Sequence, residues 1–479
     1  MAKLRIPALL VLFSAAGVVE AFRLTSLSSL NNSDIWWHLS SGLWTLQHHS
    51  LPHAGIFSQS STQPWIASSW AYEVLLAIAY KLLGLGTIPW LLMSFRAALA
   101  ILTFLLAGGR RGRFWLAMGL SVLTQYILAP AQPGPAYVST LFWGLELLLL
   151  LNARRSGNSR PLWSLPVLFL LWANLHVQFI YGVVVLVLFL GAVTIEKSLN
   201  ISSTLNVGQA GAIIAASIVA TLATPYLFGP YAVFFKTTFS SANRYLPDFQ
   251  ALGFRQPQDY LLLLLAMSAF LALGLRRSRD LFQIAVLAFS LGISLYSRRD
   301  IWMVALASLS VIEEATAIGE KFGAEQREKS ARDLWTALGA SLAILVIVFL
   351  LRVPRNREAL LAKVRETYPV AACEYIRQHG LPQPLFNAYE WGGFLTWYLP
   401  EYPVAIDSRT DLYGTDAITE YSKVMNAELP FTGYQVLAEA EIILLPKRAM
   451  MGIALSSVPR FKVEYSDDVA VVLTPRAMP

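Results

Sequence analysis

The chain contains 479 residues, of which 56% are hydrophobic and only 14% are charged, with a formal net charge of +7. Soluble globular chains carry about 25% charged residues, so this composition excludes an ordinary soluble protein and predicts a polytopic membrane protein. The lysines and arginines stand in short clusters between apolar runs, as the positive-inside rule expects, so the net charge does not indicate nucleic-acid binding. The single cysteine, Cys373, excludes an intramolecular disulfide.

Apolar segments of roughly the length that crosses a bilayer, about 20 residues, recur from the N-terminus to residue 352. They lie at 6–24, 71–85, 88–107, 114–130, 136–152, 162–175, 178–195, 206–224, 259–275, 281–296, 301–316 and 334–352. The first lacks a clear small-residue cleavage site, so it is predicted to be a helix. Segment 71–85 is short and follows Trp70, so we expect a re-entrant or interfacial helix. That leaves about eleven crossings, with about thirteen as the alternative.

Basic clusters set the predicted orientation. Lys3 and Arg5 place the N-terminus inside, and further inside clusters follow at Arg110 to Arg113, Arg154 with Arg155, Lys197, and Arg276 to Arg279. The outer side then receives the loops 28–70 and 225–258, the turn at 297–300, and the residues after the last apolar segment. We expect a multi-pass protein of the cell (inner) membrane.

The outer loop 28–70 contains four of the six histidines and no lysine or arginine. Its run Asp34-Ile35-Trp36-Trp37-His38, if helical, puts Asp34 and His38 on one face and the indoles at the membrane interface. A carboxylate there can act as a general base on a hydroxyl, or hold a divalent cation (Mg²⁺ or Mn²⁺) that binds a phosphate. The alternative is an interfacial helix with Ser33 or Asp34 as its N-cap. The histidines lack the spacing of a zinc motif, so we expect no metal site from them.

Polar residues at three other outer places are candidates for substrate binding. His176 ends an apolar segment beside Asn174 and Gln178, where it either faces a cavity or caps a helix. The turn Ser297-Arg298-Arg299-Asp300 breaks the positive-inside pattern, and its guanidinium groups are suited to bind a lipid phosphate; a salt-bridged turn is the alternative. Arg244, in the loop 225–258, is a further candidate for the same role.

Residues 354–479 alternate helix and strand signals, which predicts a soluble extracytoplasmic α/β domain after a transmembrane domain at 1–353. Helices are expected near 356–379, 415–426 and 446–455, and strands at 385–389, 404–407, 441–445, 461–465 and 469–473. Asp407 ends a predicted strand, where α/β sheets tend to bind ligands. Asp407 and Arg409 are therefore candidates for substrate contacts, and Gly392-Gly393 is interpreted as a tight turn.

The run Asp34-Ile35-Trp36-Trp37-His38 after a first helix, the many short-looped helices and the final soluble domain together resemble the GT-C superfamily of membrane glycosyltransferases. The similarity is to the protein O-mannosyltransferase and lipid-A-sugar transferase branches. Tyr389-Glu390-Trp391-Gly392-Gly393 is distantly similar to the Trp-rich motif of the oligosaccharyltransferase catalytic subunit, without its Trp-Trp-Asp-Tyr-Gly string. The resemblance implies a GT-C-like all-α membrane domain, and an enzyme that takes sugars from polyprenyl-phosphate carriers on the outer membrane face.

The sequence and this resemblance together predict an inverting glycosyltransferase in which Asp34 is the base, His38 orients Asp34 or assists phosphate binding, and Arg298 and Arg299 neutralise the leaving phosphate. Trp37 and His176 are expected to bind substrate in the cavity that would hold these residues. The expected partners are a polyprenyl-phosphate-linked sugar, a glycan, lipid or protein acceptor, and the bilayer, with no nucleic acid. Alternatives are an O-antigen polymerase or ligase, which would use the arginines without Asp34, and a non-catalytic lipid or sugar transporter or scaffold.

Overall fold

The computed structural model describes residues 28–60, 62–109, 114–130, 134–199, 205–278, 280–316, 343, 347 and 356–476. Contacts within the chain divide it into two compact units. A helical unit contains Leu91–Phe228 and Pro247–Val353, and a mixed unit contains Leu27–Trp90, Gly229–Leu246 and Pro354–Pro479. The predicted division into a membrane domain (1–353) and a soluble domain (354–479) depends on which residues lie in the bilayer, and it remains a prediction. The compact units add that the first outer loop and residues 229–246 pack with the C-terminal residues.

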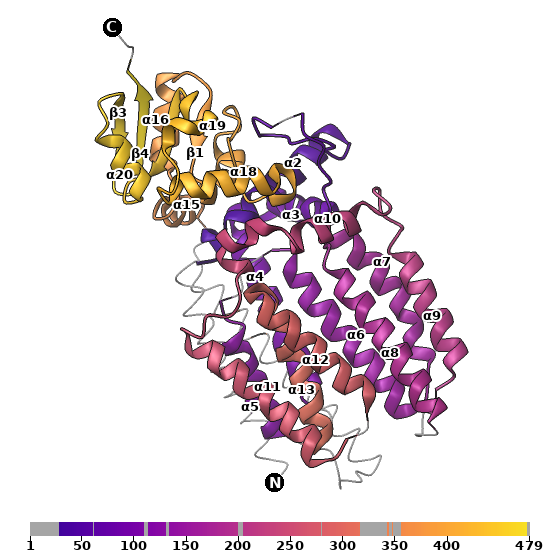
Figure 1. Ribbon diagram of the computed structural model, residues 1–479. Coiled ribbons are helices and arrows are strands. Elements are labelled where there is room, and N and C mark those ends of the chain that lie inside the picture. The colour runs from indigo at the N-terminus through magenta and orange to yellow at the C-terminus, as the bar shows by residue number, and fades with distance from the viewer. Residues whose placement is uncertain are drawn as a thin grey trace. The chain divides into compact units, whose positions relative to one another are not determined.

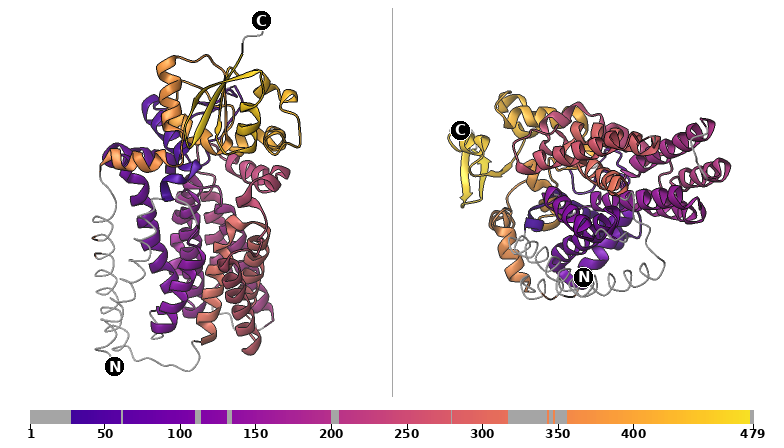
Figure 2. Two further views of the ribbon diagram at one scale, coloured as in Figure 1. Left: turned by 90° about the vertical axis from the view of Figure 1, so that its left-hand side faces the viewer. Right: turned by 90° about the horizontal axis from the view of Figure 1, so that it is seen from below.

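The helical unit consists of helices with short connections. Its elements are α4 (Thr87–Leu106), which begins in the mixed unit, α5 (Phe114–Ile127), α6 (Ala136–Ser156), η5 (Arg160–Ser164), α7 (Leu165–Leu175), α8 (Phe179–Ser198), α9 (Val207–Ala220), η7 (Pro247–Phe249), α11 (Pro257–Leu275), α12 (Leu281–Tyr296), η8 (Arg298–Asp300) and α13 (Trp302–Thr316). Helices α6 to α9 run side by side (Figure 1), and α11 and α12 both pack against α13. Figure 2 shows these helices from two further directions.

Each predicted apolar segment from 71–85 to 301–316 is helical, because its residues are good helix formers and bury one face on neighbouring helices. Among the described residues, four stretches are long and apolar enough to cross a membrane: Trp70–Leu106, Ala136–Ser156, Phe179–Ser198 and Pro257–Leu275. The protein is therefore a membrane protein, while its orientation and the predicted eleven to thirteen crossings stay predictions. Segment 6–24 lies outside the described residues, as does 334–352 except for residues 343 and 347.

Segment 71–85 forms a helix of its own. Helix α3 (Trp70–Leu83) ends at Gly84, whose φ of 61° is a conformation that glycine adopts without steric cost. A short turn, η3 (Gly84–Gly86), then leads into α4. Because α3 packs with the mixed unit and most of α4 belongs to the helical unit, the chain contains a real break where the re-entrant helix was predicted. Its depth in the bilayer stays a prediction.

The mixed unit joins the first outer loop to a small sheet. The elements before the sheet are η2 (Ser28–Asn31), α2 (Ser33–His48), α3, α10 (Gly229–Thr238), η6 (Ser241–Tyr245), α15 (Arg357–Arg365) and α16 (Val370–His379). The strands of the sheet and the helices between them are β1 (Leu385–Asn387), α17 (Tyr389–Tyr398), α18 (Thr410–Met425), η9 (Phe431–Gly433), α19 (Gln435–Ala438), β2 (Ile442–Pro446), α20 (Met450–Ser456), β3 (Phe461–Ser466) and β4 (Ala470–Pro475). The strand order is β1-β2-β4-β3, with β1 parallel to β2 and the other pairs antiparallel. A mostly helical chain with a C-terminal α/β part is thus confirmed.

Two local predictions were wrong. Segment 404–407 is not a strand of the sheet, because Val404 instead makes an isolated bridge to Ser58 of the first outer loop. Its carbonyl accepts from Gln59 N at 3.0 Å, and its own N–H donates to Phe57 O at 2.9 Å. The prediction that Asp407 ends a strand of the sheet was therefore wrong. Gly392 and Gly393 lie inside helix α17 rather than in a tight turn.

Glycines let three helices of the mixed unit approach closely. A Cβ at Gly393 of α17 would lie 2.2 Å from the Ser33 carbonyl oxygen of α2, and one at Gly42 of α2 would lie 2.0 Å from the Glu73 carbonyl oxygen of α3. Real Cβ atoms never come so near, so these residues set the packing of α2 against both neighbours. Trp36 of α2 is consequently buried and stacks on Trp397 at a ring-centroid distance of 4.8 Å, which corrects its predicted place at the membrane interface.

Candidate active site

Asp34 occupies the first turn of α2 and does not cap it. The cap is Asn32, whose Oδ1 accepts from the N–H groups of Asp34 at 2.7 Å and Ile35 at 2.9 Å. The predicted alternative, in which Ser33 or Asp34 is the N-cap, was therefore wrong. Among the described residues, only the Ser33 hydroxyl donates to the Asp34 carboxylate, at 3.3 Å, and the side chain is half-buried. Asp34 thus keeps most of its acceptor capacity for another group.

His38 is held by Glu73 rather than by Asp34. Its Nδ1 lies 3.1 Å from Glu73 Oε1, and the Ser41 hydroxyl donates to Glu73 Oε2 at 2.6 Å. All three side chains are buried. A carboxylate bonded to Nδ1 fixes the orientation of the imidazole and directs Nε2 to other partners. The contact shows His38 in a buried dyad, and no described contact supports the predicted orienting of Asp34 by His38.

Glu73 was not among the candidates predicted from the sequence. It is the single acidic residue between Asp34 and Glu146. A lone acid in a segment that contains no basic partner before Lys81 must find a polar partner if it is buried, and the histidines of the preceding loop are the nearest candidates. That signal could have paired it with a histidine, although not with His38 in particular.

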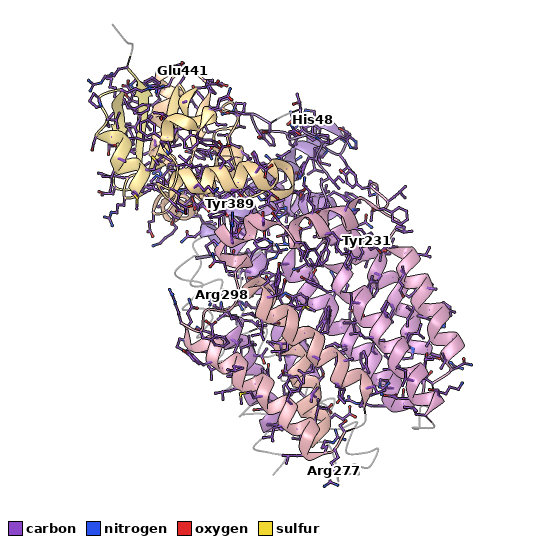
Figure 3. All side chains as sticks on the ribbon, in the orientation of Figure 1. His48, Tyr231, Arg277, Arg298, Tyr389 and Glu441 are labelled. Atoms are coloured by element: carbon purple, nitrogen blue, oxygen red, sulfur yellow. The ribbon has the colours of Figure 1, made fainter. Side chains whose placement is uncertain are left out.

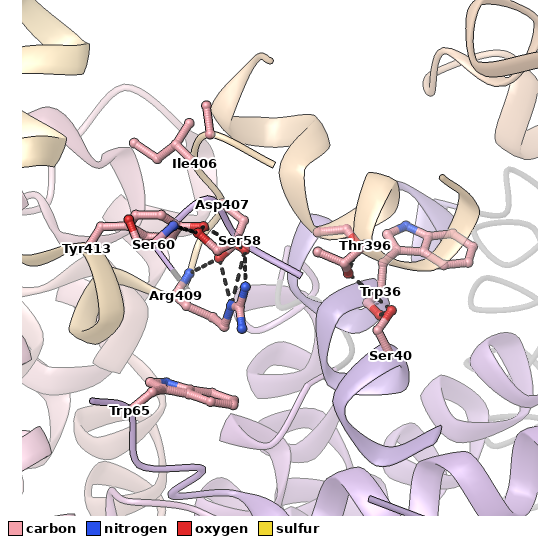
Figure 4. A network of polar contacts seen from close by, with 12 residues as sticks. Trp36, Ser40, Ser58, Ser60, Trp65, Thr396, Ile406, Asp407, Arg409 and Tyr413 are labelled. Carbon is pink, nitrogen blue, oxygen red and sulfur yellow. Dashed lines mark hydrogen bonds and ion pairs between the residues drawn. The ribbon is translucent and has the colours of Figure 1, made fainter. Parts of the chain in front are cut away.

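Trp37 connects the His38–Glu73 pair to the C-terminal part of the mixed unit. Its ring lies 3.6 Å from the His38 ring and 6.0 Å from the Trp65 ring, centroid to centroid. Trp65 Nε1 in turn donates to Asp411 Oδ2 at 3.0 Å, and the Arg409 guanidinium lies 5.1 Å from the Trp65 ring. The first outer loop and the start of α18 therefore meet at Trp65 (Figure 4).

Asp407 and Arg409 form a buried ion pair in the same region (Figure 4). Arg409 Nη2 lies 2.6 Å from Asp407 Oδ2, and Nε and the backbone N–H donate to Oδ1 at 3.0 and 2.9 Å. The Tyr413 hydroxyl donates to Oδ2 at 3.0 Å. With relative exposures of 0% and 2%, both charges are satisfied inside the protein. These contacts favour a structural role; the predicted substrate contacts of Asp407 and Arg409 stay a prediction.

The ion pair and its burial shift several pKa values. Burial alone would lower the pKa of Arg409, but Asp407 beside it raises that pKa above its ordinary value. Burial, followed by the charge of Asp407, raises the pKa of Tyr413. Burial also raises the pKa of Asp411 to about 6, against the opposing effects of its hydrogen bonds and of Arg409. Folding therefore disfavours the ionised form of the Asp411 carboxyl.

Replacing Asp411 by Asn is expected to stabilise the mixed unit by roughly 1–3 kcal/mol at pH 7.5, and by much less at pH 4. Because the folded pKa is raised to about 6, the neutral form contributes stability that is complete below the unfolded pKa of about 4 and is lost as the pH rises through 6. Asn keeps an oxygen that accepts from Trp65. Thermal unfolding of the full-length protein at both pH values measures the effect.

The control for this substitution is Asp416→Asn, at an exposed position of the same helix. It should leave the unfolding temperature unchanged at either pH. An Asp411→Asn effect of equal size at pH 4 and pH 7.5 would mean that the stabilisation does not come from ionisation.

The two-arginine turn lies in the helical unit, between α12 and α13 (Figure 3). Arg298 Nη2 donates to Gln256 Oε1 at 2.8 Å and to Asp259 Oδ1 at 3.2 Å. The Arg299 guanidinium lies 5.0 Å from the Phe249 ring, and it makes no ion pair within the described ranges. Arg298 thus fits the predicted salt-bridged turn, whereas Arg299 keeps a half-buried charge available for an anion.

The structure brings His176 close to this turn through its neighbours along the chain. Gln178 Nε2 donates to Asp300 Oδ1 at 2.6 Å, and the Tyr181 hydroxyl donates to Asp300 Oδ2 at 3.0 Å. His176 is buried, with Nδ1 2.7 Å from the Ser139 hydroxyl, which also accepts from Trp172 Nε1. The start of α8 and the arginine turn therefore form one hydrogen-bonded region of the helical unit.

The remaining predicted residues belong to different units. Arg244 lies in η6 of the mixed unit, with its guanidinium 4.9 Å from the Tyr245 ring. Asp34 and His38 lie in the mixed unit, and Arg298, Arg299 and His176 lie in the helical unit. The single cavity predicted around all of them stays a prediction. In the described part of the chain, no three His, Cys, Asp or Glu side chains are grouped so that they could hold a metal ion.

No protein-family model matches this sequence, and no curated protein matches it either. The chain is similar in structure to ArnT from Cupriavidus metallidurans bound to undecaprenyl phosphate, with 12% identity over 95% of this chain and 97% of ArnT and a TM-score of 0.47. It is also similar to the archaeal oligosaccharyltransferase AglB from Archaeoglobus fulgidus in complex with an inhibitory peptide and a dolichol-phosphate. There the identity is 12% over 91% of this chain and 69% of AglB, with a TM-score of 0.48.

At these identities and TM-scores the similarity assigns no substrate and no residue role. Those assignments rest on the contacts of this chain.

Proposed function

We propose that this protein is an integral-membrane glycosyltransferase that moves a sugar from a polyprenyl-phosphate donor to a hydroxyl-bearing acceptor on the extracytoplasmic side. The observation that carries the proposal is the state of Asp34. Its carboxylate is half-buried and receives one hydrogen bond from the described residues, whereas Glu73, Asp407 and Asp300 are each held by several protein groups. A half-buried carboxylate left in that state suits a general base.

The reaction would proceed by inversion at the anomeric carbon. Asp34 takes the proton of the acceptor hydroxyl while that oxygen bonds to the anomeric carbon, and the bond from this carbon to the phosphate oxygen breaks on the opposite face. The polyprenyl phosphate leaves with the bonding electrons, and the acceptor gains the sugar. No redox partner is needed, and the proton on Asp34 passes to water afterwards.

Of the two arginines in the turn, Arg299 is the better suited to neutralise the leaving phosphate. Negative charge grows on that phosphate as its bond to the sugar breaks, and a guanidinium that is not already paired lowers the energy of that state. Arg298 is less suited because Asp259 and Gln256 already occupy it. This division of roles sharpens the prediction from the sequence, in which both arginines were equal.

Glu73 and His38 would serve on the acceptor side. With Nδ1 held by Glu73, the imidazole presents Nε2 and can bond a sugar or acceptor oxygen. As an alternative to its role as base, Asp34 would be the residue to hold a divalent cation, Mg²⁺ or Mn²⁺, which would supply positive charge to a bound phosphate.

The test uses purified full-length protein in liposomes with a set of polyprenyl-phosphate sugars, and it measures released polyprenyl phosphate. Arg299→Ala is expected to lower kcat/KM for the donor about ten- to a hundredfold, the effect of losing a charge-assisted hydrogen bond of about 1.5–3 kcal/mol in the transition state. Arg298→Ala should have a smaller effect.

Arg277→Ala, at an exposed arginine of the helical unit (Figure 3), is the matched control and should leave kcat/KM unchanged. A folded wild-type protein that consumes no donor in the set would contradict the proposed function. Equal effects of Arg277→Ala and Arg299→Ala would contradict the role of Arg299.

A further inference from the structure

Helix α10 and the residue after it carry an exposed apolar side. Its exposed apolar residues are Ala232, Phe235 and Phe239. Phe235 and Phe239 are 53% and 68% exposed. Large apolar side chains so open to the surroundings, and adjacent along one stretch of chain, mark a surface that another apolar phase covers.

Helix α10 has one exposed apolar side and one side that packs within the mixed unit. Phe235 and Phe239 are spaced i, i+4 and their rings stack at 6.2 Å with an interplanar angle of 10°, and Ala232 falls on the same side. Pro230 and Phe234 are buried on the other side. Seven of the ten residues of the helix are apolar, and it has one buried and one exposed apolar side, which suits a helix that lies between a protein and a lipid phase.

Helix α10 carries a single charge. Between Lys197 and Arg244 the sequence contains one charged residue, Lys236, which is exposed. Its Nζ donates to the Asp411 carbonyl oxygen at 2.9 Å, and a second hydrogen bond joins Ser240 Oγ to Thr415 Oγ1 at 2.9 Å. The one cation of this stretch is thus bound to the start of α18.

The chain itself keeps α10 near a membrane surface. Gly229, the first residue of α10, follows Ala220, the last residue of the apolar helix α9, by nine residues. An extended chain of that length reaches at most about 30 Å, and the intervening turns shorten it. A helix so close in sequence to the end of an apolar bundle helix cannot lie far from the headgroup layer.

We propose that α10 is an interfacial helix whose Phe235 and Phe239 insert into the boundary between the headgroups and acyl chains of the bilayer. Through Lys236 and Ser240 the inserted helix holds the start of α18, where Asp411 bonds Trp65 of the first outer loop. The lipid surface thereby fixes how far from the bilayer the contact between Trp65 and Asp411 lies. The inference does not depend on the glycosyltransferase activity.

The experiment places a nitroxide spin label at Phe235→Cys in the full-length protein, reconstituted in phospholipid nanodiscs. The native Cys373 is buried and is the only cysteine, so the label goes to the introduced thiol. Glu441→Cys, at an exposed position before β2 (Figure 3), is the matched control. Collision rates with oxygen, which concentrates in lipid, and with a water-soluble nickel chelate report the surroundings of each label.

At position 235 we expect frequent collisions with oxygen and a loss of collisions with nickel, and at position 441 the reverse. A label at 235 that collides with nickel as often as the label at 441 would overturn the proposal, since the surface would then face water. An immobilised label shielded from both reagents would also overturn it, because a protein partner or second copy would be covering the helix.

Discussion

Replacing Asp34 by Asn is expected to lower kcat for sugar transfer by about two to four orders of magnitude, the usual contribution of a general base. The amide cannot accept the hydroxyl proton, but its size and its oxygen are retained, so α2 and its Asn32 cap should remain intact. The KM for the polyprenyl-phosphate donor should change little, because Asp34 acts on the acceptor. The measurement is the steady-state release of polyprenyl phosphate from the donor by the purified full-length protein.

Asp468→Asn is the control for this substitution, since Asp468 is an exposed aspartate in the turn between β3 and β4 of the same unit. It should retain wild-type kcat. Full activity in a folded Asp34→Asn variant would refute the assignment of the base. If Arg299→Ala were at the same time inactive, the polymerase or ligase mechanism, which needs no aspartate in the first loop, would become the better description.

Replacing Arg409 by Ala is expected to destabilise the mixed unit by about 3–5 kcal/mol, because it leaves the Asp407 carboxylate buried without its cation. Asp407 is fully buried, and most of its hydrogen bonds come from Arg409. Unfolding of this unit can be followed at Cys373, which is buried in α16 and is the only cysteine. The rate of maleimide labelling across a urea series should rise at lower urea in the variant.

The matched control removes both charges together, as Asp407→Asn with Arg409→Met. Because no uncompensated charge remains, this double variant should lose much less stability than Arg409→Ala alone. A stable Arg409→Ala variant that fails to bind donor would instead support the substrate contact predicted from the sequence. Equal losses in the single and double variants would show that packing around Trp65, and not the ion pair, sets the stability.

The candidate site shows where reasoning from the sequence stops. Hydropathy and helical spacing were sufficient to place Asp34 and His38 on one helix and to single out the Arg298–Arg299 turn, because these are local properties of the chain. They could not tell that Asn32 would cap α2, since Ser33 and Asp34 are equally good caps by type. They also could not rank the two arginines, because that depended on Asp259 and Gln256 on another helix.

The apolar character of the chain, the ten helices from 71–85 to 301–316 and a small C-terminal sheet followed from the sequence, since burial of regularly spaced apolar side chains is a short-range pattern. Tertiary structure alone decided the partners of the polar groups. His38 meets Glu73 from 35 positions away, and Trp65 meets Asp411 from 346 positions away. Such pairs exist because a buried charge or N–H must find a complementary group wherever folding brings one, and no local pattern records which one that will be.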